Sequence, residues 1–90
     1  MKLIKISALW CPACLITNKA VNKLIEEDRN RELISIDYDF DEEEVKKYNV
    51  GKILPVLIFE KDNKEVLRLN GEKNYEEIKK AVGEIKWKDL

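Results

Sequence analysis

Histidine is absent from this 90-residue chain, which also has only two cysteines, two prolines and three glycines. Zinc sites need about four ligands, drawn mainly from cysteine, histidine and carboxylate side chains. A single chain with two thiols and no imidazole therefore completes no ordinary zinc site. Three scattered glycines also provide no fingerprint for binding a dinucleotide. We therefore expect neither a metal nor an organic cofactor.

Net charge is also nearly absent, because 17 basic and 18 acidic residues almost cancel. Without a basic excess, there is no electrostatic reason to expect nucleic acid or an anionic membrane as a partner. No apolar run approaches the ~20 residues that span a bilayer, and the segment Met1–Ile6 resembles a charged strand rather than a signal peptide. We therefore expect one cytoplasmic domain over residues 1–90.

Hydrophobic periodicity predicts the element order β-α-β-α-β-β-α. The expected strands are Leu3–Ser7, Leu33–Phe40, Val56–Phe59 and Glu65–Leu69. The expected helices are Pro12–Glu27, a short one from Asp41 to about Tyr48, and a last one capped by Asn74 with an apolar face of Tyr75, Ile78, Val82 and Ile85. A helical crossover makes the first two strands parallel, and the later hairpin is antiparallel. The pattern predicts an α/β fold with a mixed four-stranded sheet flanked by helices.

Three local signals refine this prediction. The pairs Asp41/Glu44 and Asn74/Glu77 have the spacing of a capping box, in which two side chains bond backbone N–H groups at a helix start. The run Val56–Phe59 is continuously apolar, as in a strand buried on both faces. The expected apolar stripe of the first helix consists of Ala13, Ile16, Ala20, Val21, Leu24 and Ile25.

Both cysteines belong to the motif Trp10-Cys11-Pro12-Ala13-Cys14, between the first strand and the first helix. Two thiols one helical turn apart can close a small disulfide and so store two electrons. Unpaired N–H groups at a helix start stabilise an anion, and cysteines in such places have pKa values of ~3.5–7.5 instead of ~8.5. Proline suits the first helical position. We therefore predict that Cys11 is the exposed attacking thiolate and Cys14 the buried resolving thiol.

Two other interpretations of the cysteine pair remain open. A structural disulfide is one, although so small a loop removes little chain entropy. A thiolate–metal site shared by two chains is the other, because a dimer would supply four sulfur ligands. In a reducing cytosol, a C-x-x-C pair is more often catalytic or metal-binding than structural. Redox chemistry is therefore the favoured interpretation.

In combination, these motifs resemble the thioredoxin fold. The shared features are W-C-P-x-C after a first strand, Leu54-Pro55-Val56 at the start of a buried strand, a hairpin, a glycine and an amphipathic helix. The resemblance covers nearly the whole chain, without the N-terminal strand and helix of full-length thioredoxins. It implies a cis Leu54–Pro55 bond facing the cysteines, where the backbone of Leu54 can bond an extended substrate segment.

The resemblance also implies a shallow apolar substrate-binding surface around the cysteines. Its members are Trp10, Pro12, Ala13, Leu54, Pro55 and Gly71. Trp10 occupies the family's aromatic position and Gly71 the position of its glycine after the hairpin. Three of these residues also have a purely structural interpretation. Trp10 can be a packed aromatic, Pro55 a proline that starts a strand, and Gly71 a routine loop glycine.

Some residues depart from the family pattern. Thioredoxins place a buried aspartate about six residues before the attacking cysteine, where this chain has Lys5. The matching lysine of the second strand falls near Ser35. One hypothesis is that Lys5 stabilises thiolate and makes the pair more oxidising; the alternative is that its ammonium reaches solvent at the sheet edge.

The resemblance implies a thiol–disulfide oxidoreductase that reduces protein disulfides as a monomer and receives electrons from an external reductase. The redox-active group is the Cys11–Cys14 disulfide. A glutaredoxin-like reductase recycled by glutathione is an alternative, although Ile53-Leu54-Pro55 and the segment Asn70–Lys73 lack the glutathione-binding pattern of glutaredoxins. A non-catalytic redox-sensing or thiolate–metal-binding module is another.

Overall fold

The computed structural model describes residues 2–27 and 31–84. Its elements are β1 (Lys2–Ser7), α1 (Pro12–Glu27), β2 (Glu32–Asp37), α2 (Glu42–Lys47), β3 (Val56–Lys61), β4 (Lys64–Asn70) and α3 (Tyr75–Glu84). β1 pairs in parallel with β2 and antiparallel with β3, which pairs antiparallel with β4. The strand order is β2-β1-β3-β4. This confirms the predicted mixed four-stranded sheet and its order of elements.

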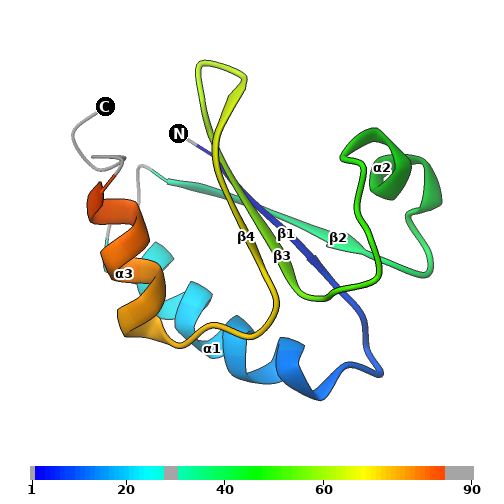
Figure 1. Ribbon diagram of the computed structural model, residues 1–90, viewed down its shortest axis with the longest axis horizontal. Coiled ribbons are helices and arrows are strands. Elements are labelled where there is room, and N and C mark those ends of the chain that lie inside the picture. Colours follow the sequence, from blue (N-terminus) through cyan, green and yellow to red (C-terminus); the bar gives the residue numbers. More distant parts are fainter. Residues whose placement is uncertain (1, 28–30, 85–90) are drawn as a thin grey trace.

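The helices cover the two faces of the sheet unequally. α1 and α3 lie together on one face, whereas the short α2 lies on the other (Figure 1). No helix in the described part of the chain has the length and apolar character needed to cross a membrane.

The larger side chains gather under α1 and α3, in what we call the α1–α3 core. Its buried members are Leu3, Ala20, Val21, Leu24, Leu57, Phe59, Ile78 and Val82. Leu3 of β1 and Phe59 of β3 are opposite one another in the sheet and fully buried. The amphipathic faces of the two helices therefore cover the two central strands.

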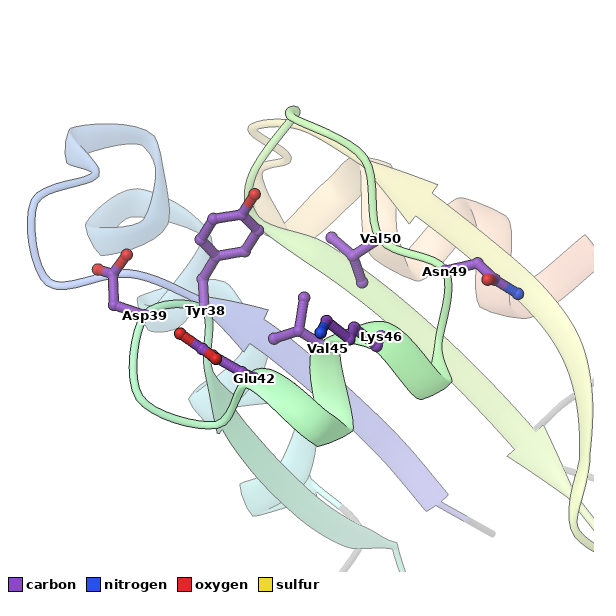
Figure 2. A pocket seen from close by; sticks show the side chains of 7 residues that line it. All are labelled: Tyr38, Asp39, Glu42, Val45, Lys46, Asn49 and Val50. Atoms are coloured by element: carbon purple, nitrogen blue, oxygen red, sulfur yellow. The ribbon is translucent and has the colours of Figure 1, made fainter.

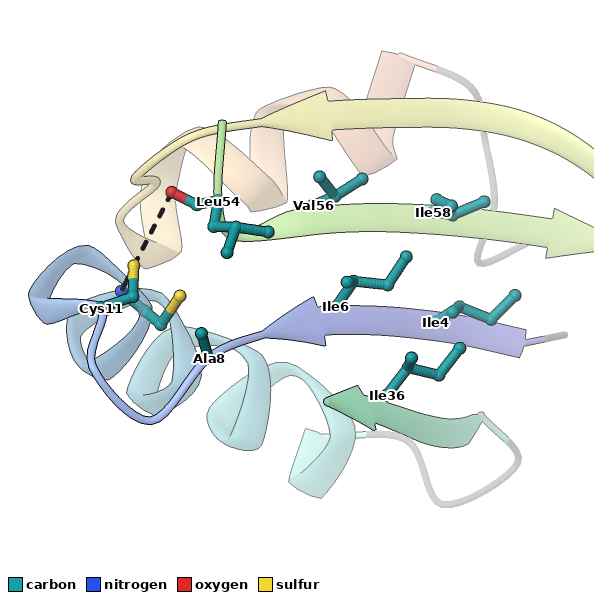
Figure 3. Close-up of a cluster of buried hydrophobic side chains, with 9 residues drawn as sticks. Ile4, Ile6, Ala8, Cys11, Ile36, Leu54, Val56 and Ile58 are labelled. Carbon is teal, nitrogen blue, oxygen red and sulfur yellow. Dashed lines mark hydrogen bonds between the residues drawn. The ribbon is translucent and has the colours of Figure 1, made fainter. Parts of the chain in front are cut away.

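On the other face, the alternate residues of the same strands form the α2-side core. Its buried members are Ile4, Ile6, Ala8, Cys11, Cys14, Ile36, Leu54, Val56 and Ile58. Figure 3 shows the isoleucines and Val56 on one face of the sheet, with Cys11 and Leu54 at its end. The run Val56–Phe59 is at most 1% exposed, which confirms that this strand is buried on both faces. Both cysteines are thus part of the hydrophobic core.

The apolar stripe predicted for α1 is wrong at Ile16, which is 50% exposed. Thr17 is fully buried in its place. Its hydroxyl oxygen accepts a hydrogen bond of 3.0 Å from the backbone N–H of Lys73, in the segment before α3. A buried N–H group needs a partner, so the polar Thr17 is better suited than isoleucine to hold that segment against α1.

The second strand ends at Asp37, three residues before the predicted end at Phe40. β1 ends at Ser7, which pairs with Asp37, so further residues find no partner strand. One carboxylate oxygen of Asp37 accepts the backbone N–H groups of Asp39 and Phe40, at 2.9 and 3.0 Å. These bonds turn the chain into the segment that leads to α2.

The two predicted capping boxes have different outcomes. Asn74 and Glu77 exchange reciprocal bonds of 2.8 and 3.2 Å, which confirms the box at the start of α3. Asp41 makes no such cap for α2, because its carboxylate accepts the backbone N–H of Asp37 at 2.8 Å. The last residue of the predicted apolar face of α3, Ile85, is outside the described residues.

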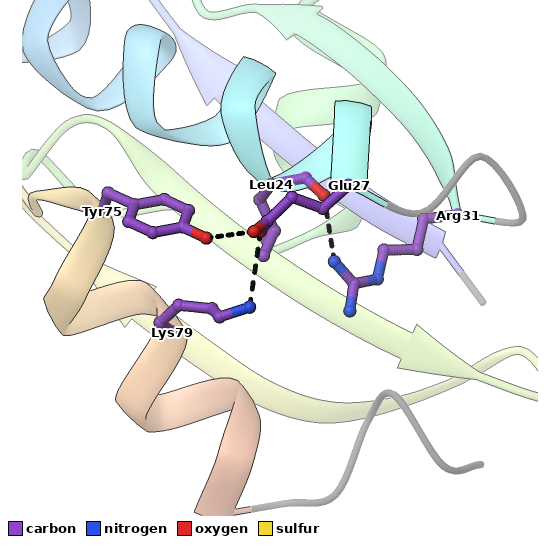
Figure 4. A network of polar contacts seen from close by, with 5 residues as sticks. All are labelled: Leu24, Glu27, Arg31, Tyr75 and Lys79. Atoms are coloured by element: carbon purple, nitrogen blue, oxygen red, sulfur yellow. Dashed lines mark hydrogen bonds and ion pairs between the residues drawn. The ribbon is translucent and has the colours of Figure 1, made fainter.

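Polar contacts on the surface join the ends of α1 and α3 (Figure 4). The carboxylate of Glu27 accepts a hydrogen bond from the hydroxyl of Tyr75 and forms an ion pair of 3.4 Å with the ammonium of Lys79. The hydrogen bond lowers the pKa of Glu27 and raises that of Tyr75. Arg31 donates to the carbonyl of Leu24 at 3.0 Å, which satisfies an end group of α1.

β4 is an outer strand with a polar surface. The register shifts between Phe59 and Glu60 on its partner strand β3, which marks a bulge. Arg68 donates to both carboxylate oxygens of Glu65, at 3.1 and 2.8 Å. The hairpin turn at Asp62 and Asn63 has φ angles of 52° and 64°, as in a type I′ turn, and confirms the predicted turn.

Candidate active site

The cysteine motif lies where β1 leads into α1. The N–H of Cys11 bonds the carbonyl of Ala8 at 3.2 Å, which closes the loop just before the helix. Pro12 is the first residue of α1, as predicted. The backbone N–H of Cys14 is 3.3 Å from the sulfur of Cys11 and 3.2 Å from its carbonyl oxygen. A donor of the first helical turn is therefore directed at the Cys11 sulfur, where it stabilises negative charge.

Both thiols are free and largely buried. Cys11 is 7% exposed and Cys14 1%, so the predicted order of exposure is confirmed, but the expectation of an exposed Cys11 is wrong. The physical reason is that Ala8 and Leu54 pack around Cys11 within the α2-side core. The thiol of Cys11 also donates a long hydrogen bond, 3.9 Å, to the carbonyl oxygen of Leu54 (Figure 3).

The surroundings of Cys14 disfavour its thiolate form. Burial and a hydrogen bond with Cys11 raise the pKa of Cys14 from 9.0 to about 11. A backbone hydrogen bond with Ala8 and the positive charge of Lys5 act in the opposite direction. At neutral pH, Cys14 is therefore protonated in the reduced protein.

The loop before β3 brings Leu54 and Pro55 to the cysteines. The Leu54–Pro55 peptide bond is cis, as the resemblance implies. Both residues are buried, and the carbonyl oxygen of Pro55 accepts a 2.9 Å hydrogen bond from the N–H of Gly71. The structure thus brings Cys11, Cys14 and Leu54 into one cluster and links Gly71 to its edge.

Gly71 has a φ angle of +88°, a conformation that residues with a side chain rarely adopt. We expect Gly71→Ala to lower the free energy of unfolding by about 1–2 kcal/mol, from backbone strain. A Cβ there would be 3.5 Å from Ile53, an ordinary contact, so crowding adds little. Urea denaturation measures the change.

The matched control is Gly51→Ala. A Cβ at Gly51 would have no described neighbour within 4 Å, and a Gly→Ala change that the backbone tolerates is neutral or slightly stabilising. Equal stability of both variants would contradict a strained role for Gly71.

Trp10 is on the surface beside the motif, 62% exposed. Its indole N–H donates a 2.7 Å hydrogen bond to the carboxylate of Asp39, in the turn after β2. Pro12 is exposed and Ala13 half-buried. Other exposed large apolar side chains of the chain include Leu9, Leu15, Ile16, Phe40 and Ile53. The predicted surface residues therefore differ in exposure, and their roles stay predictions.

Sequence reasoning missed the contacts of Asp39 and Ala8. A signal for Asp39 existed, because the carboxyl ends of parallel strands meet at one edge of a sheet, and Asp39 follows β2 just as Trp10 follows β1. Ala8 contacts the site through its backbone, and the side-chain chemistry of a sequence does not reveal backbone contacts.

The described part of the chain also has an open cavity of about 660 Å³ away from the cysteines. Figure 2 shows its lining from α2 and the flanking loops. The lining residues are Tyr38, Asp39, Glu42, Val45, Lys46, Asn49 and Val50. Its link to the cysteine motif is Asp39, which binds Trp10.

Comparison with known proteins decides the family. The thioredoxin family profile matches residues 1–84. The chain belongs to the thioredoxin family. Thioredoxins are thiol–disulfide oxidoreductases, and membership supports that general class of activity for this protein. No curated protein sequence matches it significantly.

Solved structures agree with this assignment to the thioredoxins. Fasciola hepatica thioredoxin is 30% identical, with a TM-score of 0.81 over 92% of this chain and 78% of that one. Mitochondrial thioredoxin 3 from Saccharomyces cerevisiae is 22% identical, with a TM-score of 0.80 over 92% and 76%. A complex of ferredoxin:thioredoxin reductase and thioredoxin f2 gives 23% identity and a TM-score of 0.77 over 94% and 76%. The last two matches show the fold.

Proposed function

We propose that this thioredoxin-family protein reduces disulfide bonds in protein substrates, with Cys11 as the nucleophile and Cys14 as the resolving cysteine. The observation that carries the proposal is the backbone N–H of Cys14 directed at the Cys11 sulfur, 3.3 Å away, at the start of a 16-residue helix. The greater exposure of Cys11 supports the same order of roles.

The reaction has two exchange steps. The Cys11 thiolate attacks one sulfur of the substrate disulfide; a Cys11–substrate disulfide forms, and the other substrate sulfur leaves as a thiolate. Cys14 then loses its proton and attacks the Cys11 sulfur. The Cys11–Cys14 disulfide forms, and the second substrate sulfur leaves. The substrate gains two electrons, which the protein dithiol supplies.

The surroundings of Cys11 suit an extended substrate segment. Exposed Trp10 and half-buried Ala13 flank the motif. The backbone of Leu54 contacts Cys11 through its carbonyl oxygen, so a segment that binds there by main-chain hydrogen bonds places its sulfur next to Cys11. Pro12, Pro55 and Gly71 complete the proposed surface.

The proposal needs no cofactor beyond the cysteine pair, but it needs an electron donor. A reductase that returns the disulfide to the dithiol supplies the electrons, and a reducing compartment such as the cytoplasm suits this cycle. The complex of thioredoxin f2 with ferredoxin:thioredoxin reductase is an example of such a partnership in a similar fold. We propose that the protein acts as a monomer.

Insulin reduction by dithiothreitol tests the activity. We expect the protein to accelerate insulin precipitation above the rate with dithiothreitol alone. A rate equal to that background would overturn the proposal and favour a non-catalytic redox module. The source of electrons is tested separately. Turnover with glutathione alone would show a glutaredoxin-like cycle in place of an external reductase.

A further inference from the structure

Lys5 stands on the face of the sheet that α1 and α3 cover. It lies in β1, a central strand, directly opposite Leu57 of β3, which is fully buried in the α1–α3 core. On its other side, Lys5 is paired with the small, exposed Ser35 of β2. Lys5 itself is half-buried. A lysine thus interrupts a covered apolar face, one pleat after the buried Leu3.

The same register places Lys5 beneath the start of α1. Leu3 of β1 and Val21 of α1 belong to the same α1–α3 core, and α1 runs antiparallel to β1 (Figure 1). The step from Leu3 to Lys5 along β1 covers about 7 Å. The step from Val21 back to Cys14, two turns along α1, covers about 10 Å. Both displacements have the same direction, so Lys5 is on the Cys14 side of the helix.

The inward stripe of α1 is polar at this point. Asn18 lies one turn after Cys14 and one turn before Val21, and its side-chain oxygen is buried without a hydrogen-bond partner among the described residues. Such an acceptor is unfavourable unless a donor or a cation is near. Lys5 does not hydrogen-bond this oxygen, but a positive charge below the stripe favours it electrostatically.

Few charged groups surround Cys14. Besides a backbone hydrogen bond from Ala8, the groups of the described chain that shift the pKa of Cys14 are Cys11 and Lys5. From β2, the acid on the same face as Lys5 is Asp37, whose carboxylate accepts two backbone N–H groups of the following turn. From β3, the residue opposite Lys5 is the apolar Leu57. Within the described chain, no carboxylate forms an ion pair with Lys5.

We propose that Lys5 is a positioning residue for the second exchange step, in which its ammonium stabilises the thiolate that Cys14 must form before it attacks Cys11. This inference rests on the proposed function. Once Cys11 is bonded to a substrate it carries no charge, and Lys5 is then the remaining charged group that acts on Cys14. The proton of Cys14 goes to solvent, and the substrate sulfur leaves with the electron pair.

The proposal differs from a simple change in oxidising power. Burial lowers the pKa of Lys5 and a Cys14 thiolate raises it, so the two groups favour each other's charged forms. The pKa of Cys14 is about 11 in the reduced protein, so at neutral pH little thiolate exists for Lys5 to stabilise at equilibrium. Its effect is therefore on the rate of resolution, which depends on the thiolate fraction.

The experiment separates the two steps with dithionitrobenzoate. Attack by Cys11 releases one thionitrobenzoate, and resolution by Cys14 releases the second. We expect Lys5→Met to leave the first release unchanged and to slow the second between about threefold and tenfold at pH 7. Loss of the nearby positive charge reduces the thiolate fraction of Cys14, and the higher nucleophilicity of a more basic thiolate offsets part of that loss. The deficit should vanish above the pKa of Cys14.

Lys5→Arg keeps the charge and should restore the second release to within about twofold of the wild type. Lys2→Met makes the same substitution in β1 on the opposite face and should change neither step. Lys5→Gln serves as a second neutral variant if Lys5→Met does not fold. An unchanged second release in the neutral variants would overturn the proposal, and so would an arginine variant as slow as Lys5→Met.

The test is independent of the substrate class. If the protein fails to reduce insulin but still shows a slower second release in Lys5→Met, the proposed function fails and the role of Lys5 stands. If insulin is reduced but both releases are the same in all variants, the proposed function stands and the role of Lys5 fails.

Discussion

Disulfide reduction is expected to fall by more than about a hundredfold when Cys11 is replaced by serine, because nucleophile replacements remove most of the catalytic rate. The hydroxyl of serine does not ionise at neutral pH, so the backbone N–H at 3.3 Å would have no thiolate to stabilise. Insulin reduction measures the loss. Full activity of Cys11→Ser would contradict the assigned role.

Cys14→Ser is the informative partner of that variant. We expect it to react once and to accumulate a mixed disulfide through Cys11, because no thiol remains to resolve it. Mass spectrometry of the trapped species identifies the bonded cysteine. If instead Cys11→Ser accumulates mixed disulfides through Cys14 and Cys14→Ser does not, the two roles are reversed.

The second large effect is expected in the core. Phe59 is fully buried in the α1–α3 core, where the loss of a phenylalanine side chain costs about 3–5 kcal/mol. Small domains have total stabilities at the lower end of about 5–15 kcal/mol. We therefore expect Phe59→Ala to be close to unfolded, as measured by urea denaturation and circular dichroism.

Phe40→Ala is the matched control, because the same side chain is removed from a position that is 79% exposed. Its stability should stay within about 0.5 kcal/mol of the wild type. A Phe59→Ala protein that unfolds at the same urea concentration as Phe40→Ala would show that the α1–α3 core does not determine stability.

Much of the fold could be predicted from the sequence, because local signals agreed with tertiary packing. α1 begins at Pro12, and its bounds match the prediction. The capping box of Asn74 formed, and its side-chain oxygen accepts the backbone N–H of Glu77. Asp41 has the same spacing, but its carboxylate is taken by a backbone group across the turn. A capping pattern cannot reveal a competing partner that the fold itself supplies.

The candidate site was less accessible to prediction. The motif located both cysteines, and the resemblance supplied the cis bond at Pro55. The burial of Cys11 could not be predicted, since it depends on Leu54, which is distant in sequence and reaches the site only through the fold. The exposure of Ile16 has a similar cause, because helical periodicity does not tell which side of a stripe meets the sheet.

The register shift at the outer strand β4 has a consequence for the proposed binding of extended segments. An open sheet edge invites pairing with other chains, which leads to aggregation. The bulge beside Glu60 and the ion pair of Arg68 with Glu65 make β4 a poor template for such pairing. Extension of the sheet by a second chain is therefore disfavoured at the β4 edge.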